Sequence, residues 1–469
     1  MEPNQTPVVD QSHNQISSEG TATQSAPEVA PKKKFDFKIV LVAIVVLVLF
    51  LLLFIFLKNR FSSTSNQGGG GEIVWWGLWE DEQTVKSLIT DYESKNPKVK
   101  IKYIKQSKED YRERLTNALA KGTGPDIFRF HNTWVPMFKN ELDRMPTSVY
   151  STSDFANTFY PVAVSDLTLG NSIVGIPLEY DGLVLYINED MFEKAGKSVP
   201  TNWNDLRTVA MELTITDQDN NITQSGVALG RTENVDHWAE ILALMMLQNG
   251  VDLTKPTGQL AEDALNFFVI FSNDDKVWDA TLASSTVAFA SGKLAMYFGP
   301  SWRSFEIRNQ NPNLRFKTVP VPQLPKLSAD EPDVNYAGYW VEGVWTRSTK
   351  KAEAWKFLKY LSEKENQQKF YDSASKIRMF GEPYSRMDMA DSLLSHPIVG
   401  AVVSEAKTAQ TWFLQTKTWD GSTGINSQIT KYFEDAVNAV NLGREVNVSL
   451  ATVASGVAQV LTQYGIRIQ

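Results

Sequence analysis

The stretch that decides the fold runs Gly175-Ile176-Pro177-Leu178-Glu179-Tyr180-Asp181-Gly182-Leu183-Val184-Leu185-Tyr186-Ile187-Asn188. Two apolar segments, residues 175–178 and 183–187, flank a polar break at residues 179–182. The β-branched and aliphatic residues of both segments predict two strands, or one long interrupted strand. We interpret the stretch as leaving one hydrophobic core, crossing a polar gap and entering another. The gap is then where a ligand would lie and where the molecule would bend.

Length and composition limit what the protein can be. A chain of 469 residues is too long for one hydrophobic core, so we expect more than one lobe. The net charge is −8, and an acidic body argues against binding nucleic acid. The chain has no cysteine, which excludes disulfides, thiolate metal sites, a cysteine nucleophile and a lipid-anchored cysteine. The 13 tryptophans indicate either a large core or a site that stacks flat rings against a ligand.

The N-terminal region predicts a membrane anchor. Residues 1–37 are polar, and we expect a disordered cytoplasmic tail. Residues 38–57 contain an uninterrupted apolar run of 19 residues, enough to cross a bilayer, with no signal-peptidase site after it. More lysines precede this run than follow it, which places the N-terminus in the cytoplasm. Residues 58–71 are a flexible linker. We therefore expect a single-pass protein of the cell membrane whose binding domain lies outside the cell.

After the linker, the pattern predicts a parallel α/β sheet. Strands and helices alternate from residue 72 to residue 130, an order typical of parallel sheets. In open sheets of this class, ligands bind beyond the carboxyl ends of the strands. Packing of the rings within the fold is the alternative for each tryptophan at these ends. The side chains that follow the two strand ends are those of Trp79, Glu80, His131, Asn132 and Trp134.

Five short sequence blocks follow one another in a specific order and at a specific spacing. They lie at residues 124–127, 175–188, 199–206, 291–302 and 337–362. Together they resemble the family 1 extracellular solute-binding proteins, the maltose-binding-protein-like sugar-binding subunits of ABC importers. The resemblance extends over essentially all of residues 72–469. The predicted N-terminal anchor departs from the usual pattern of that family, which is a cleaved signal or a lipid-modified cysteine.

The resemblance implies a fold and a function. The fold is α/β, a two-lobe periplasmic-binding-protein-like fold of type II, here with an N-terminal transmembrane helix. Lobe 1 would comprise residues 72–180 plus about 340–385, and lobe 2 residues 183–335 plus about 388–469. The chain would cross about three times between the lobes. The implied function is reversible capture of a sugar or oligosaccharide by hinge closure and its delivery to an ABC permease, by a monomer without cofactor.

The resemblance also points to cleft residues. Glu179 and Asp181 lie at the first crossing, where they could accept hydrogen bonds from hydroxyl groups. The turn at residues 299–301 leads to Trp302 and Arg303; in the family an aromatic ring at this turn often stacks on the sugar. For Trp340, at the second crossing, packing is an equal alternative. A later loop that overhangs the cleft in the family carries Trp412 and Trp419.

Two other functions stay open at this point. The adjacent carboxylates Glu80 and Asp81 could serve a tethered glycan-acting enzyme. The same fold could also present a ligand to a membrane partner, as a sensor or adhesin. No zinc-hydrolase His-Glu-x-x-His motif, Gly-x-Ser-x-Gly elbow or phosphate-binding glycine loop with lysine occurs in the sequence. We therefore expect a binding protein with no catalytic residues and no metal.

Overall fold

The structure, a computed structural model, describes residues 46, 48–49, 71–326, 328 and 330–467. Internal contacts divide the chain into two units, residues 1–67 and 68–469. The predicted tail, anchor and linker lie almost wholly outside the described residues. Within the part that is described, we find no helix that is both long enough and apolar enough to span a membrane. The second unit carries the two lobes and is described below.

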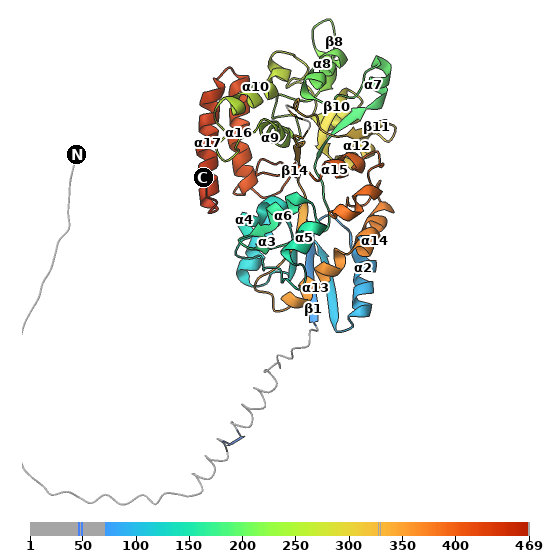
Figure 1. The fold of residues 1–469 in the computed structure, drawn as a ribbon, viewed down its shortest axis with the longest axis vertical. Coiled ribbons are helices and arrows are strands. Elements are labelled where there is room, and N and C mark those ends of the chain that lie inside the picture. The colour runs from blue at the N-terminus through green and yellow to red at the C-terminus, as the bar shows by residue number, and fades with distance from the viewer. Residues whose placement is uncertain (1–45, 47, 50–70, 327, 329, 468–469) are drawn as a thin grey trace, which may run out of the picture. The chain divides into compact units, whose positions relative to one another are not determined.

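One five-stranded sheet lies in the lower half of Figure 1 and has the order β2-β1-β3-β13-β6. Strand β1 pairs in parallel with both β2 and β3, which confirms the predicted parallel sheet. Strand β13 returns antiparallel to β3 and pairs with β6 on its other side. The strands are β1 (Gly71–Gly77), β2 (Val99–Lys105), β3 (Ile127–His131), β6 (Ile176–Pro177) and β13 (Trp340–Val344).

The second five-stranded sheet has the order β11-β7-β10-β9-β8. Strand β7 lies antiparallel to both β10 and β11, and all six of its residues are buried. Its continuous apolar sequence is the pattern expected for a strand covered on both faces. The strands are β7 (Leu183–Asn188), β8 (Ile215–Thr216), β9 (Ile222–Val227), β10 (Leu294–Pro300) and β11 (Phe316–Val319).

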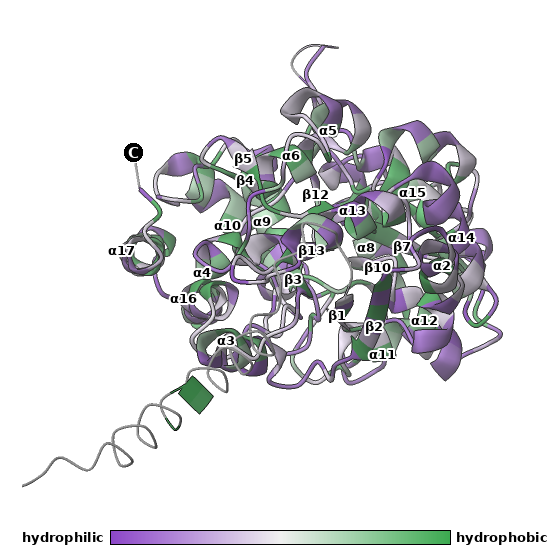
Figure 2. Ribbon diagram, turned by 90° about the horizontal axis from the view of Figure 1, so that it is seen from below, coloured by the Kyte–Doolittle hydropathy of each residue, from purple (hydrophilic) through white to green (hydrophobic). Residues whose placement is uncertain are grey.

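Helices cover both sheets, and most bury one face. In α17 (Val446–Gln463) the buried residues recur every three or four positions, and Figure 2 shows purple and green residues mixed on this outer helix. Helix α9 (Trp238–Gln248) is buried on nearly all faces, as its apolar sequence predicts. The other helices are α2 (Glu82–Lys95), α3 (Tyr111–Lys121), α4 (Val135–Phe138), α5 (Thr152–Thr158), α6 (Pro161–Leu167), α7 (Glu189–Ala195), α8 (Trp203–Leu213), α10 (Gln259–Asn273), α11 (Ser285–Ala290), α12 (Arg303–Gln310), α13 (Lys351–Leu361), α14 (Lys364–Ser375), α15 (Val399–Glu405) and α16 (Ile425–Asn441), with 3₁₀ turns η1 (Asn132–Trp134) and η2 (Met387–Ser392).

Short strands complete the described secondary structure. β4 (Thr168–Leu169) and β5 (Ser172–Ile173) form a hairpin. β12 (Asn335–Tyr336) pairs in parallel with β14 (Ala409–Gln410), which joins two segments far apart in the sequence.

The chain passes between the two sheets at three places that touch one another. Strands β6 and β7 belong to different sheets, so residues 175–188 pass from one sheet to the other. The second passage links β11 to β13 through β12, and the third lies between α14, packed on α2, and α15, packed on β11. Gly182 bridges to Ala337, the Gly338 N–H donates to the Asp181 carbonyl (3.1 Å), and the Tyr180 N–H donates to the Pro383 carbonyl (2.9 Å).

Candidate functional site

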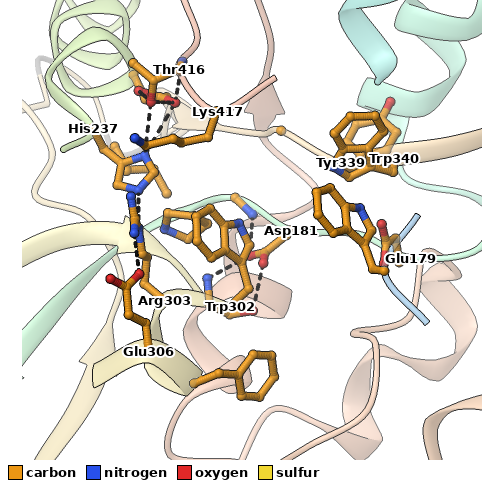
Figure 3. A pocket seen from close by; sticks show the side chains of 18 of the residues that line it. Glu179, Asp181, His237, Trp302, Arg303, Glu306, Tyr339, Trp340, Thr416 and Lys417 are labelled. Carbon is orange, nitrogen blue, oxygen red and sulfur yellow. Dashed lines mark hydrogen bonds and ion pairs between the residues drawn. The ribbon is translucent and has the colours of Figure 1, made fainter. Parts of the chain in front are cut away.

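A cleft of about 700 Å³ lies where the crossing segments join the two sheets. Glu179, Tyr180, Asp181 and Gly182, the polar break of the sequence, all line it. Other lining residues follow strands of both sheets, and Figure 3 shows their side chains directed into the space from several elements. A pocket of this size is large enough to enclose a small organic ligand.

Three tryptophans form an aromatic platform on the first-sheet side of the cleft. The ring centroid of Trp79 lies 5.4 Å from that of Trp340 and 5.2 Å from that of Trp419. Behind Trp340, His131 and the fully buried Trp134 pack edge-on at 5.2 and 5.4 Å. Burial lowers the pKa of His131 to about 3, so its ring is neutral. The platform is therefore an apolar surface with indole N–H groups at its edges.

A second aromatic group lies on the other sheet, at the start of α12. The Arg303 guanidinium lies over the Trp302 ring, 4.6 Å from its centroid, and the His237 ring meets Trp302 edge-on at 5.8 Å. Arg303 Nε donates to His237 Nε2 (2.9 Å), so the ring hydrogen is on Nδ1, which faces Glu240. Burial lowers the pKa of His237. These contacts hold the Trp302 ring in the cleft (Figure 3).

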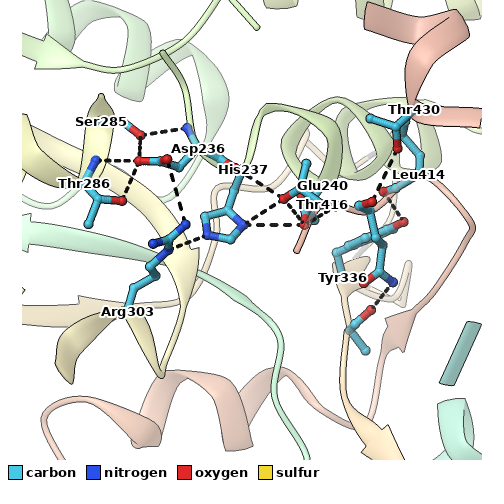
Figure 4. Close-up of polar contacts among 12 residues, drawn as sticks. Asp236, His237, Glu240, Ser285, Thr286, Arg303, Tyr336, Leu414, Thr416 and Thr430 are labelled. Atoms are coloured by element: carbon cyan, nitrogen blue, oxygen red, sulfur yellow. Dashed lines mark hydrogen bonds and ion pairs between the residues drawn. The ribbon is translucent and has the colours of Figure 1, made fainter. Parts of the chain in front are cut away.

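The loop at residues 411–421 is fixed to α9 by a buried carboxylate. The N–H and hydroxyl of Thr416 each donate to Glu240 at 2.8 Å (Figure 4). Lys417 and Trp419 have φ angles of 54° and 50°, in the left-handed region that costs about 1–3 kcal/mol for such residues. Asp420 accepts from the first turn of α16, which holds the other end of the loop. The loop therefore presents Lys417 and Trp419 to the cleft.

Asp181 connects the first crossing to the turn before α12. Its Oδ1 accepts from the backbone N–H groups of Gly182 (2.8 Å) and Ser301 (3.0 Å), and its Oδ2 accepts from the Ser301 hydroxyl (2.8 Å). Burial raises the pKa of Asp181 to about 6. The carboxylate therefore holds the turn that carries Trp302, and all three donors come from the protein.

A buried ion network lies beneath the cleft. Arg129 on β3 donates to both oxygens of Glu80 (2.8 and 2.7 Å) and to Glu342 (2.7 Å), and each of the three side chains is at most 2% exposed. Glu342 also accepts from the indole N–H of Trp75 (3.1 Å). A charged group is tolerated at such depth only with complete pairing.

A second carboxylate pair borders this network and reaches the cleft. Glu179 and Glu382 hydrogen-bond to each other, and burial raises the pKa of Glu179. Burial also acts to raise the pKa of Glu382, but Arg378 and the hydrogen bonds outweigh it and lower that pKa. Glu179 therefore carries the shared proton. Carboxylate oxygens of Glu80, Glu179 and Glu382 lie within 4.8 Å of one another, but Glu80 is paired with Arg129, Glu382 with Arg378, and Glu179 is hydrogen-bonded to Glu382.

Comparison with known proteins identifies the family. The family model for bacterial extracellular solute-binding proteins matches residues 87–378. The chain belongs to this family. This solute-binding protein is 24% identical to a binding protein of Brucella abortus over 289 residues, covering 60% of this chain and 68% of that protein. It is 23% identical to the multiple sugar-binding protein of Streptococcus mutans over 312 residues, covering 62% and 71%.

Its fold is similar to those of solved solute-binding proteins. One is an ABC transporter solute-binding protein from Thermotoga lettingae, solved with α-D-tagatose bound. The TM-score is 0.63 at 20% identity, over 84% of this chain and 100% of that chain. This confirms the predicted two-lobe α/β fold. The family comprises binding proteins, in agreement with the prediction that this solute-binding protein is not an enzyme. Consistently, Glu80 is paired with Arg129, and its neighbour Asp81 pairs with Lys105 at 2.7 Å instead of facing the cleft.

The structure brings most of the sequence-predicted site residues together. Within the described chain, the predicted residues that line the cleft are Trp79, His131, Glu179, Asp181, Trp302, Arg303, Trp340 and Trp419.

Four predicted residues lie outside the cleft. Glu80 points down into the Arg129 network, and Trp134 turns back into the core behind Trp340. Asn132 and Trp412 line a separate hollow of about 360 Å³. His131, the last residue of β3, reaches the cleft, whereas Asn132 and Trp134 belong to the following 3₁₀ turn η1 and do not line it.

Several cleft residues of this solute-binding protein were missed by the sequence reasoning. Glu240 gave a usable signal, because it is the one charged side chain in the otherwise apolar helix α9. Lys417 lies between the predicted site residues Trp412 and Trp419. The others gave no local signal: Lys108, His237, Thr416, Arg378 and Glu382.

Proposed function

We propose that this protein binds a sugar or oligosaccharide in the cleft and delivers it to an ABC permease. The proposal rests on two aromatic groups that lie on opposite sides of one cavity, with polar side chains between them. Trp79, Trp340 and Trp419 form one group, and Trp302 with Arg303 forms the other. A sugar has apolar C–H faces and a polar rim of hydroxyls, which match stacked rings with polar groups between them.

Relatives support a saccharide as ligand. The Streptococcus mutans relative is named for binding multiple sugars, and the Thermotoga lettingae structure contains α-D-tagatose. The mechanism that we propose is reversible capture without chemistry on the ligand. Lobe 1 (residues 72–180 and about 340–385) and lobe 2 (residues 183–335 and about 388–469) would close about the crossing segments. The permease would then recognise the closed form.

We further propose that residues 38–57 anchor the protein in the cell membrane, with the N-terminus cytoplasmic and the binding unit outside as a monomer. The apolar run in the sequence supports this arrangement. Protease added to intact cells should remove the binding unit while an N-terminal epitope stays protected. Cleavage of both, or release of the binding unit without protease, would contradict the anchor.

The function is tested with the full-length protein purified in mild detergent. A thermal-shift screen against mono- and oligosaccharides should reveal a stabilising ligand, because a ligand that binds only the folded state raises its stability. Chromatography of the same mixtures should show the saccharide unchanged. Product formation would support the tethered enzyme instead. Co-purification with permease subunits favours import, and co-purification with a signalling partner favours the sensor.

A further inference from the structure

The hydrogen-bonding capacity of the cleft is unbalanced. Its carboxylates already accept from protein donors: Asp181 from Ser301, Glu240 from Thr416, and Glu306 from Arg303. Glu382 accepts from Arg378, and Glu179 carries the proton that the two glutamates share. The ionised carboxylates of the cleft therefore each have at least one protein donor before a ligand binds.

Donors, in contrast, are free. Among the described residues, the indole N–H groups of Trp79, Trp302, Trp340 and Trp419 have no hydrogen-bond partner, although all four rings line the cleft. The Arg303 side chain is only 7% exposed, and its Nη2 makes no hydrogen bond. The carboxylate oxygen of Asp236 lies 3.9 Å from Nη2, too far for a hydrogen bond. Of these donors, Arg303 Nη2 is buried without a partner, which is uncommon in folded proteins, and the indole N–H groups remain accessible to a ligand.

Two lysines add charge to these donors. Lys417 is exposed, lines the cleft and makes no hydrogen bond or ion pair within the described chain. Lys108 also lines the cleft, with its Nζ 5.2 Å from the centroid of Trp419. Lys417 therefore belongs to the loop at residues 411–421, and Lys108 contacts Trp419 of the same loop. In Figure 3, Lys417 lies on the same side of the pocket as His237 and Arg303, across from Trp340.

The free donors favour a ligand that supplies hydrogen-bond acceptors, and the two lysines favour a ligand that carries negative charge. A neutral sugar offers each hydroxyl as donor and acceptor alike, and its donors would meet carboxylates that are already occupied. A carboxylate or sulfate group accepts only and pairs with ammonium groups. We propose that the ligand is an acidic saccharide, whose anionic group lies against Lys417 and Lys108 while its ring stacks on the tryptophans. This inference rests on the proposed sugar-binding function.

The test uses matched ligand pairs and the full-length protein in detergent. Trigalacturonate, trimannuronate and a sulfated chondroitin disaccharide are compared with the methyl esters of the first two and the desulfated form of the third. Titration calorimetry at 50 and 300 mM salt gives each Kd. We expect at least one anionic member to bind at least tenfold more tightly than its neutral partner, with the advantage shrinking at high salt. The uronate and sulfate arms identify the anionic group.

Variants locate the charge that is recognised. Lys417→Met should weaken binding of the anionic member about three- to fivefold, the Lys108→Met/Lys417→Met double variant more, and Lys417→Arg should retain it. Lys407→Met is the matched control, since Lys407 is exposed, unpaired within the described chain and outside the cleft. Equal or tighter binding of the neutral partners, or an unchanged Kd in the double variant, overturns the acidic-saccharide inference while the sugar-binding function stands. Absence of binding by all anionic and neutral saccharides, including those of the general screen, overturns both.

Discussion

Replacing Arg129 with methionine tests whether the buried ion network supports the floor of the cleft. Arg129 is 1% exposed and is the counter-charge of Glu80 and Glu342, which are also buried. Breaking a buried ion pair by removing one partner costs about 3–5 kcal/mol, because the remaining charge is stranded. We expect Arg129→Met to lower the free energy of unfolding by that amount. Urea denaturation at pH 7.5, followed by tryptophan fluorescence, measures it.

A control variant and the pH dependence show whether Arg129→Met destabilises the protein by stranding buried charge or by altering side-chain packing. The triple variant Glu80→Gln/Arg129→Met/Glu342→Gln has no buried charge at these positions and should recover most of the loss. Burial already raises the pKa of Glu342 while Arg129 opposes the rise, so removing Arg129 raises it further. An acid whose folded-state pKa is raised loses stability as pH increases, so the deficit of Arg129→Met should be smaller at pH 5 than at pH 7.5. A loss below about 1 kcal/mol, or a triple variant as unstable as the single one, would refute the reasoning.

Three further predictions concern the cleft and its crossing segments. Trp302→Ala should weaken the saccharide found in the screen at least tenfold (about 1.4 kcal/mol) and Trp302→Phe less, by calorimetry; equal Kd values would place the ring outside the site. The raised pKa of Glu179 predicts stability that is greatest at low pH and falls as pH rises towards that pKa. Glu179→Gln should flatten this profile in urea titrations between pH 5 and 9, and an unaltered slope would contradict its protonation. Gly182→Ala puts a Cβ 2.8 Å from the Tyr336 carbonyl and should cost about 1–3 kcal/mol by urea denaturation; full stability would mean that the two segments separate freely.

Local patterns were sufficient for the architecture. Period-two and period-3.6 hydrophobicity located the strands and helices, and the polar break at residues 179–182 located the passage between the sheets. These features depend on near neighbours in the chain. The same is true of Trp302, because a strand that ends in Gly299 and Pro300 must turn before the following helix begins.

The composition of the site was less accessible because it depends on distant partners. Arg129 sits in the strand sequence Ile127-Phe128-Arg129-Phe130, where nothing local shows that Glu80 and Glu342 will neutralise it. The ion pair with Arg129 directs the Glu80 carboxylate away from the cleft. His237 is held in the cleft by partners that include Arg303, 66 residues later in the chain.

The hydrogen bonds between the three crossing segments have a mechanical consequence. The Gly182–Ala337 bridge, the bond from Gly338 to Asp181 and the bond from Tyr180 to Pro383 tie each segment to another. A rotation of the backbone in one crossing segment is therefore transmitted to the other two, and the three segments move as one unit. The bonds that join them include four residues of the cleft lining, Tyr180, Asp181, Gly182 and Gly338, and two outside it, Ala337 and Pro383. Ligand affinity can therefore be tuned at residues such as Pro383 and Ala337, outside the cleft lining, without changing a single recognition contact.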